Sequence, residues 1–189
     1  MIDKLLGLVQ EFAGSAVVEN PAVPNSKNDL AVKSIADGIL GGLKQEATGS
    51  GFGNIVGMLT KGGNVSSSVM NAVQGSVIDN LMSKVGISST VAKSIAKQVV
   101  PSILGSLSRK AADAKNTHFD AGSILSSLTG GKTKGFDIQS LVDKGIGNGD
   151  GKLDLNDVIS LLGKSQSSSG GNSGGGLLGA LGGLLGGGK

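Results

Sequence analysis

The 189-residue chain contains no cysteine, no tryptophan and no tyrosine, and only four phenylalanines. The absence of cysteine excludes disulfides, thiolate metal sites and cysteine nucleophiles. Because aromatic residues are so few, the core must be built from Val, Ile, Leu, Met and Ala, which fill helix interfaces well. The chain also lacks the aromatic platforms on which single-stranded nucleic acids stack.

Charge of either sign is scarce as well. The chain carries 17 Lys and Arg residues against 14 Asp and Glu residues, a formal net charge of +3. The lysines are scattered and Arg109 is the single arginine, so the sequence has no clustered basic surface of the kind that binds polyanions. We expect no nucleic-acid partner.

Long apolar runs are missing too. No segment approaches the ~20 apolar residues that a membrane-spanning helix needs. The N-terminal segment MIDKLLGLVQEF contains Asp3 and Glu11 and lacks the basic start and continuous apolar run of a secretory signal. We expect a soluble, cytoplasmic protein, and leave open its export by a route that uses no signal peptide.

Glycine, in contrast, is abundant, and 11 of the 34 glycines lie in the last 25 residues. The composition changes at Ser165, where SQSSSGGNSGGG begins, a sequence typical of flexible linkers. We therefore divide the chain into a helical domain (1–130), a loop and helix packed on it (131–164), and a Gly/Ser linker with a Leu/Gly-rich tail (165–189).

The tail has an apolar helical face formed by Leu177, Leu178, Leu181, Leu184 and Leu185. Such a peptide is suited to dock on a protein partner, to self-associate or to touch a membrane surface. The alternative is that its glycines deny it a stable helix in water.

Apolar residues recur at helical spacing in the first half of the chain. The first pattern, over residues 2–12, is expected to end at Gly14. A loop over residues 19–29 should end in a helix cap at Asn28 or Asp29. Further helical patterns cover residues 32–43, 52–59 and 124–128, separated by glycine-rich turns.

The strongest periodicity consists of two runs of apolar residues that step by four. The first comprises Val69, Val73, Val77, Leu81 and Val85, and the second Val91, Ile95, Val99, Ile103 and Leu107. Two such helices with a short connection make an antiparallel helical hairpin. Pro101 predicts a kink or a break near Val100. The expected fold is all-α, a compact bundle of short helices that includes this hairpin.

One stretch, GIGNGDGKLDLNDVI at residues 145–159, has the spacing of a calcium loop. That template requires oxygen ligands at alternate positions, a glycine at the sixth and a carboxylate at the twelfth. With Gly151 as the sixth residue, the ligands are Asn148, Asp150, the carbonyl of Lys152, Asp154 and Asp157. A helix containing Val158 and Ile159 should follow the loop.

The first position of the loop falls on Ile146, which cannot ligate a metal. Either the site is degenerate, or Asp143 supplies this ligand and residues 145–147 form an insertion. An Asp at the twelfth position favours weak affinity, with a dissociation constant of about 10⁻⁵ to 10⁻³ M. The competing interpretation is a simple turn in which Asp154 or Asn156 caps the last helix.

The segment GNGDGKLDLNDVISLL resembles one half of a dockerin-type or EF-hand-like calcium loop. The segments LLGLVQEFAGSAVVENPAVPNSKND and GISSTVAKSIAKQVVPSILGSL, together with this loop, resemble a bacterial family of small, Gly- and Leu-rich helical proteins of unknown function. This resemblance covers most of residues 1–164. It implies a helical fold and an acidic loop but no activity.

The single histidine, His118, has no evident nucleophile or orienting partner in the sequence, and we interpret it as a surface-loop residue rather than a catalytic base. We therefore expect a non-enzymatic helical interaction module that binds, or is stabilised by, one calcium ion. The alternative is a structural, self-assembling protein without a metal site.

Overall fold

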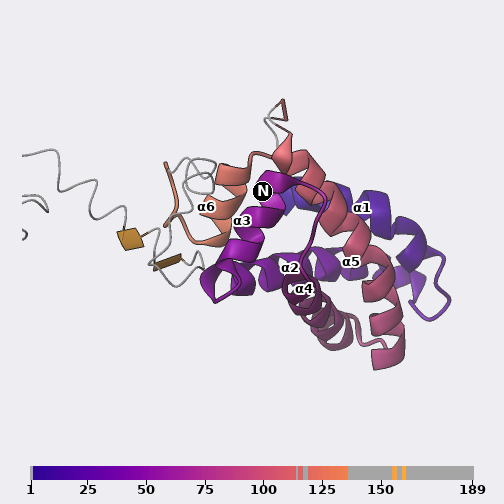
Figure 1. Ribbon diagram of the computed structural model, residues 1–189. Helices are drawn as coiled ribbons and strands as arrows, with labels where there is room; N and C mark the ends of the chain where they lie inside the picture. The colour runs from indigo at the N-terminus through magenta and orange to yellow at the C-terminus, as the bar shows by residue number, and fades with distance from the viewer. Residues whose placement is uncertain (1, 114, 117–118, 136–154, 157–158, 161–189) are drawn as a thin grey trace, which may run out of the picture. The chain divides into compact units, whose positions relative to one another are not determined.

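The computed structural model describes residues 2–113, 115–116, 119–135, 155–156 and 159–160, and this part of the chain contains helices and no strand (Figure 1). The all-α prediction is confirmed. In chain order the elements are α1 (Ile2–Val18), the 3₁₀ turn η1 (Asn25–Lys27), α2 (Asn28–Thr48), α3 (Phe52–Lys61), α4 (Ser67–Asn80), the π-helical turn η2 (Leu81–Val85), α5 (Ser89–Ala112) and α6 (Ala121–Leu128). The chain divides into two units, Met1–Ile159 and Ser160–Lys189, and all of these elements belong to the first.

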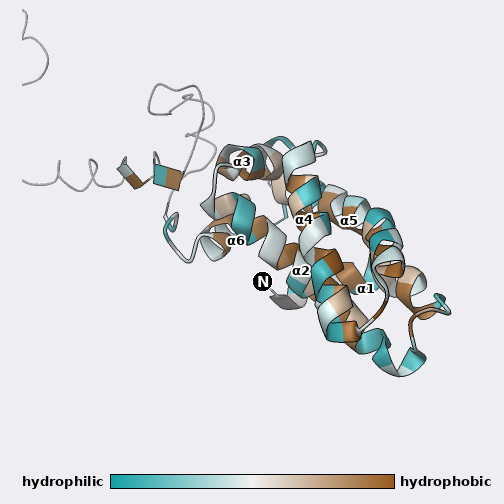
Figure 2. Ribbon diagram, turned by 90° about the horizontal axis from the view of Figure 1, so that it is seen from below, coloured by the Kyte–Doolittle hydropathy of each residue, from teal (hydrophilic) through white to brown (hydrophobic). Residues whose placement is uncertain are grey.

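Helix α2 is the central element of this unit, since it packs against α1, α3, α4 and α6 (Figure 1). Its apolar stripe is buried as the periodicity predicts, with Ile35, Ile39 and Leu43 fully excluded from solvent. Helix α5 packs against α1, α3 and α4. Figure 2 shows hydrophobic and hydrophilic residues alternating around the helices, as expected when each helix buries one side.

Helices α2 and α4 approach each other closely. A Cβ atom added at Gly38 would stand 2.6 Å from the Cα atom of Val77, and one added at Gly42 would stand 2.6 Å from the Cα atom of Val73. Carbon atoms in contact normally lie about 3.5–4.0 Å apart, so only glycine fits at these two positions. The two valines, four residues apart on α4, therefore pack directly against bare backbone of α2.

The two runs of four-residue steps form α4 with η2 and α5, and they are joined by Gly86, Ile87 and Ser88. All five residues of the first run are buried. The left-handed backbone of Gly86 (φ 78°) ends the first helical segment, and the Ser88 side chain accepts a hydrogen bond from the backbone N–H of Val91 to cap the next. Helices α4 and α5 pack on each other as the short connection predicts.

Two predicted helix boundaries are wrong. Helix α1 does not end at Gly14 but continues to Val18, because Ala13, Ala16 and Val17 extend its buried stripe beyond the glycine. The cap of α2 is neither Asn28 nor Asp29, since the helix begins at Asn28 and its N-cap residue is Lys27.

The reason for the second error is that the 3₁₀ turn η1 leads directly into α2. The side chain of Lys27 reaches a different helix end, because its Nζ atom donates a hydrogen bond to the carbonyl oxygen of Val85 at 2.8 Å. A cation at a helix C-terminus is favourably placed with respect to the helix dipole.

Pro101 does not break α5, which is helical from Ser89 to Ala112. The sequence predicted a kink or a break near Val100, and the break is wrong. Val99, Val100, Ile103 and Leu104 on either side of the proline are all buried. Burying them outweighs the one hydrogen bond that proline removes, and the ring itself lies on the exposed side of the helix.

A buried serine joins α5 to the turn that follows α3. The Oγ atom of Ser108 donates a hydrogen bond to the carbonyl oxygen of Met58 at 2.7 Å and accepts one from the backbone N–H of Gly63 at 2.8 Å. Gly62 and Gly63 both have positive φ angles, of 66° and 83°. The glycine turn that ends α3 is therefore held by the side chain of Ser108, which lies 45 residues after Gly63 in the chain.

Candidate functional site

The predicted calcium ligands lie outside the described residues. These are Asp143, Asn148, Asp150, Lys152, Asp154 and Asp157. The residues on the C-terminal side of the loop that the structure does describe, Leu155–Asn156 and Ile159–Ser160, are helical, and Leu155 is only 7% exposed. His118 and the tail of residues 165–189 also lie outside the described part.

The segment before the candidate loop ends in an ordered turn. Gly130, Gly131 and Gly135 have positive φ angles, as the GGKTKG sequence predicts. The buried Oγ1 atom of Thr129 donates a hydrogen bond to the carbonyl oxygen of Leu125 at 2.9 Å and lies 3.1 Å from the Oγ1 atom of Thr133. This buried pair anchors the turn to α6.

Within the described ranges, no three His, Asp or Glu side chains lie close enough together to hold a metal ion. In that same part of the chain no helix is long and apolar enough to cross a bilayer.

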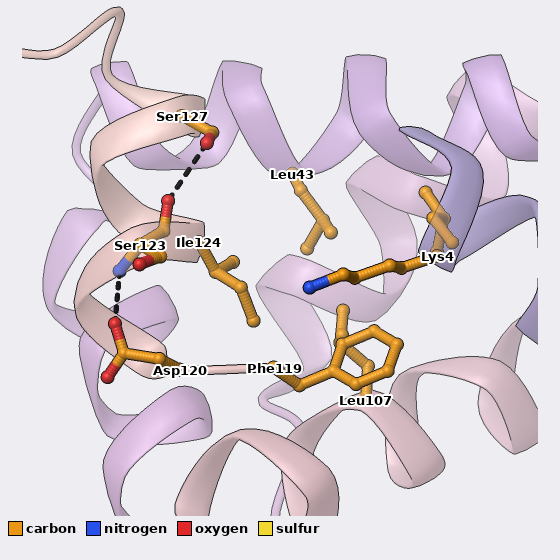
Figure 3. A pocket seen from close by; sticks show the side chains of 9 residues that line it. Lys4, Leu43, Leu107, Phe119, Asp120, Ser123, Ile124 and Ser127 are labelled. Carbon is orange, nitrogen blue, oxygen red and sulfur yellow. Dashed lines mark hydrogen bonds between the residues drawn. The ribbon is translucent and has the colours of Figure 1, made fainter. Parts of the chain in front are cut away.

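A pocket of about 150 Å³ opens between α1, α2, α5 and α6 (Figure 3). Its apolar lining comes from four elements and from Phe119, which directly precedes the cap of α6. These residues are Leu5, Leu43, Leu107, Phe119 and Ile124. Leu43 and Leu107 belong to the stripes that the periodicity identified, and both are almost completely buried. The pocket is therefore a hollow in the edge of the core, with rigid helices on its sides.

Among the described residues, the polar lining comes from Lys4 on α1, from the α6 cap residue Asp120, and from Ser123 and Ser127 on α6. Figure 3 shows the amine of Lys4 extending over the apolar residues, while Asp120 lies on the far side of the pocket. The Asp120 carboxylate caps α6, since it accepts a hydrogen bond from the backbone N–H of Ser123 at 2.7 Å. The hydroxyl of Ser127 donates to the carbonyl oxygen of Ser123 at 2.9 Å.

A second ammonium group lies beside the pocket. The Nζ atom of Lys110 stands 5.7 Å from the centroid of the Phe119 ring, within the range of a cation–π contact. The backbone N–H of Phe119 also donates to the Oδ1 atom of Asn116 at 3.3 Å. These contacts hold the ring in place beside the pocket.

Within the described part of the chain, the polar groups that line the pocket are one ammonium, one carboxylate engaged in a helix cap and two hydroxyls. The volume is well below the roughly 300–1,000 Å³ of pockets for drug-sized ligands. Any molecule bound there must be small.

Sequence reasoning did not identify this pocket. It found Leu43, Leu107 and Ile124 as core residues, but each of them contributes only part of a wall. The one local signal was Asp120 followed three residues later by Ser123 ahead of an apolar run, which is the pattern of a helix cap. Nothing in the sequence indicates that Lys4 lies near that cap.

Comparisons with protein-family models, with curated proteins and with solved structures find no match to this chain.

Proposed function

We propose that this chain is a non-catalytic helical interaction module in which one calcium ion, bound by the loop between Asp143 and Asp157, stabilises the last helix. The proposal is supported by the spacing of oxygen-bearing side chains around Gly151. A hard cation needs about 6 to 8 oxygens converging on one point, and this loop offers them from alternate residues followed by a returning carboxylate.

The observation that carries the proposal is the helix at the C-terminal side of the loop. In the EF-hand template the twelfth ligand belongs to the helix that leaves the loop. Leu155–Asn156 are helical just before Asp157, and Ile159–Ser160 are helical just after it. Leu155 is buried, so it supplies an apolar anchor for a helix at this point in the chain.

Calcium binding would then be coupled to stability. An ion that binds only the folded state stabilises it by about 2.7 kcal/mol at a concentration one hundred times its dissociation constant. With the weak affinity expected for this loop, millimolar calcium should raise the melting temperature and a chelator should lower it. The partner of the module is expected to be a protein or a second copy of the chain.

The test is a calorimetric calcium titration of chelator-treated protein, beside Asp150→Ala and the control Asp79→Ala. Asp79 is an exposed residue of α4, remote in sequence from the loop. We expect saturable binding of one ion, lost in Asp150→Ala and retained in Asp79→Ala. Leu155→Ala should retain binding but lower the melting temperature both with and without calcium, since it removes the buried anchor and leaves the ligands.

The calcium site would be refuted if the titration gave no heat and no shift in melting temperature. The calcium concentration must reach several times the weakest expected dissociation constant, about 10⁻³ M. The alternative of self-assembly would then be measured directly, by sedimentation velocity of the full chain and of a chain ending at Lys164. Loss of the oligomer in the shorter chain, independent of calcium, would assign assembly to the Leu-rich tail.

A further inference from the structure

We propose that the pocket between α1, α2, α5 and α6 binds a small, uncharged and mostly apolar molecule of about six or seven carbon atoms. The first argument is size. The pocket has a volume of about 150 Å³ and walls of leucine, isoleucine and phenylalanine. An engineered core cavity of that volume and lining takes up benzene. A much larger ligand would have to displace Leu43 or Leu107, which are buried in the core.

The second argument is that three of the polar side chains at the pocket already have partners. The Asp120 carboxylate accepts a hydrogen bond from the backbone N–H of Ser123, where the positive end of the α6 dipole stabilises its charge. The hydroxyl of Ser127 donates to the carbonyl oxygen of Ser123. Lys4 is likewise engaged in an interaction of its own. These groups do not require a charged ligand, and what the pocket offers a ligand is apolar surface.

The third argument concerns the water that a ligand would replace. A buried water molecule needs about two to four polar partners, and the leucine, isoleucine and phenylalanine walls supply none. Replacing poorly held water by an apolar group is favourable. An ionic ligand would instead give up its hydration for apolar walls, which is costly. The pocket should therefore prefer a neutral molecule to an ion of the same shape.

Phe119 is the wall that can be removed without cutting into the core. It is half-buried, whereas Leu43, Leu107 and Ile124 are buried. Its ring lies beside the other apolar lining residues in Figure 3, and the Lys110 ammonium 5.7 Å from the ring centroid holds it there. Loss of this ring should open one side of the pocket and leave the helices packed.

The probe is benzyl alcohol, a neutral molecule whose ring fits the volume, added to the full-length protein. Binding is followed through the methyl resonances of Leu43, Leu107 and Ile124. Because the ligand has few atoms and the site is partly open, we expect a dissociation constant on the order of 1 mM. Benzoate and benzylammonium, at constant ionic strength, are the anionic and cationic ligands of the same shape. Each should bind at least about tenfold more weakly.

Two variants change the pocket in opposite ways. Phe119→Ala removes a wall and should weaken benzyl alcohol about tenfold. Its matched control is Phe12→Ala, since Phe12 is a half-buried ring of α1 that does not line the pocket. Ser123→Leu adds an apolar side chain at an exposed lining position and should weaken binding by filling the opening. Its control is Ser102→Leu, at an exposed position of α5 away from the pocket.

Shifts of the three methyl-bearing residues with benzyl alcohol, with binding weakened by either pocket variant and by neither control, would establish the site. The proposal is refuted if benzyl alcohol leaves these resonances unmoved, or if benzoate or benzylammonium binds as tightly. It is equally refuted if neither pocket variant weakens binding, or if a control weakens it as much. None of these outcomes depends on calcium, so the test is separate from that of the loop.

Discussion

The packing of α4 on the glycines of α2 leads to a quantitative prediction. An alanine at Gly38 would place its Cβ atom 2.6 Å from Val77 Cα, 2.9 Å from Val77 N and 2.9 Å from Val77 Cγ2. An alanine at Gly42 would meet Val73 Cα at 2.6 Å and the carbonyl oxygen of Ala72 at 3.0 Å. Most of the atoms in the way are backbone atoms of a buried helix, so α4 itself would have to move outward by about 1 Å to restore a normal contact.

Two opposing energies decide the outcome. An alanine inside a helix is favoured over glycine by about 0.5–1 kcal/mol. Overpacking a well-filled core costs about 1–3 kcal/mol. We therefore expect Gly38→Ala and Gly42→Ala each to lower the free energy of unfolding by about 1–2 kcal/mol. The double variant should cost less than the sum, since one displacement of α4 relieves both contacts.

The matched control is Gly75→Ala on α4, where an added Cβ atom would meet nothing within 4 Å. This variant gains the helix propensity without the overlap, so it should be more stable than the parent by about 0.5–1 kcal/mol. Denaturant unfolding followed by circular dichroism at the helix band measures the stability of the parent and of all four variants. If Gly38→Ala and Gly42→Ala were as stable as Gly75→Ala, the close approach of α2 and α4 would be wrong.

Two further predictions concern α5, and both are checked by denaturant unfolding. Ser108→Ala should lower the free energy of unfolding by about 1–3 kcal/mol, because it leaves the carbonyl of Met58 and the N–H of Gly63 without their partner. The control Ser102→Ala, on the exposed side of α5, should change the free energy of unfolding by less than about 0.5 kcal/mol. Equal effects would contradict the bridging role of Ser108. Pro101→Ala restores a backbone hydrogen-bond donor at an exposed position of the helix. Proline also reduces the entropy of the unfolded chain, and that benefit is lost in the variant. The net effect should be a stabilisation of about 1–2 kcal/mol. A loss of stability would mean that the local helix shape imposed by proline is needed for packing.

The spacing of apolar residues predicted the helices well, because the apolar residues at helical spacing are the ones that the fold buries. The stripe from Val69 to Val85 is buried at every fourth residue, and the lysines at 93 and 97 are exposed on the polar side of α5. The errors arose where a local rule competed with burial. Gly14 and Pro101 are both unfavourable inside helices, yet each is flanked by buried apolar residues whose packing outweighs the local cost.

Composition and local patterns by themselves determined the all-α class, the lengths of α3 and α6 to within a few residues and the glycine-rich turns. They also yielded the calcium-loop hypothesis, because ligand spacing in such a loop is a property of neighbouring residues. Tertiary structure alone decided which helices meet. Gly38 and Gly42 resemble other helical glycines in sequence, and only the approach of Val73 and Val77 makes a larger residue costly there. Likewise Lys4 and Phe119 line one pocket because α1 and α6 both pack against α2, a proximity that no local spacing encodes.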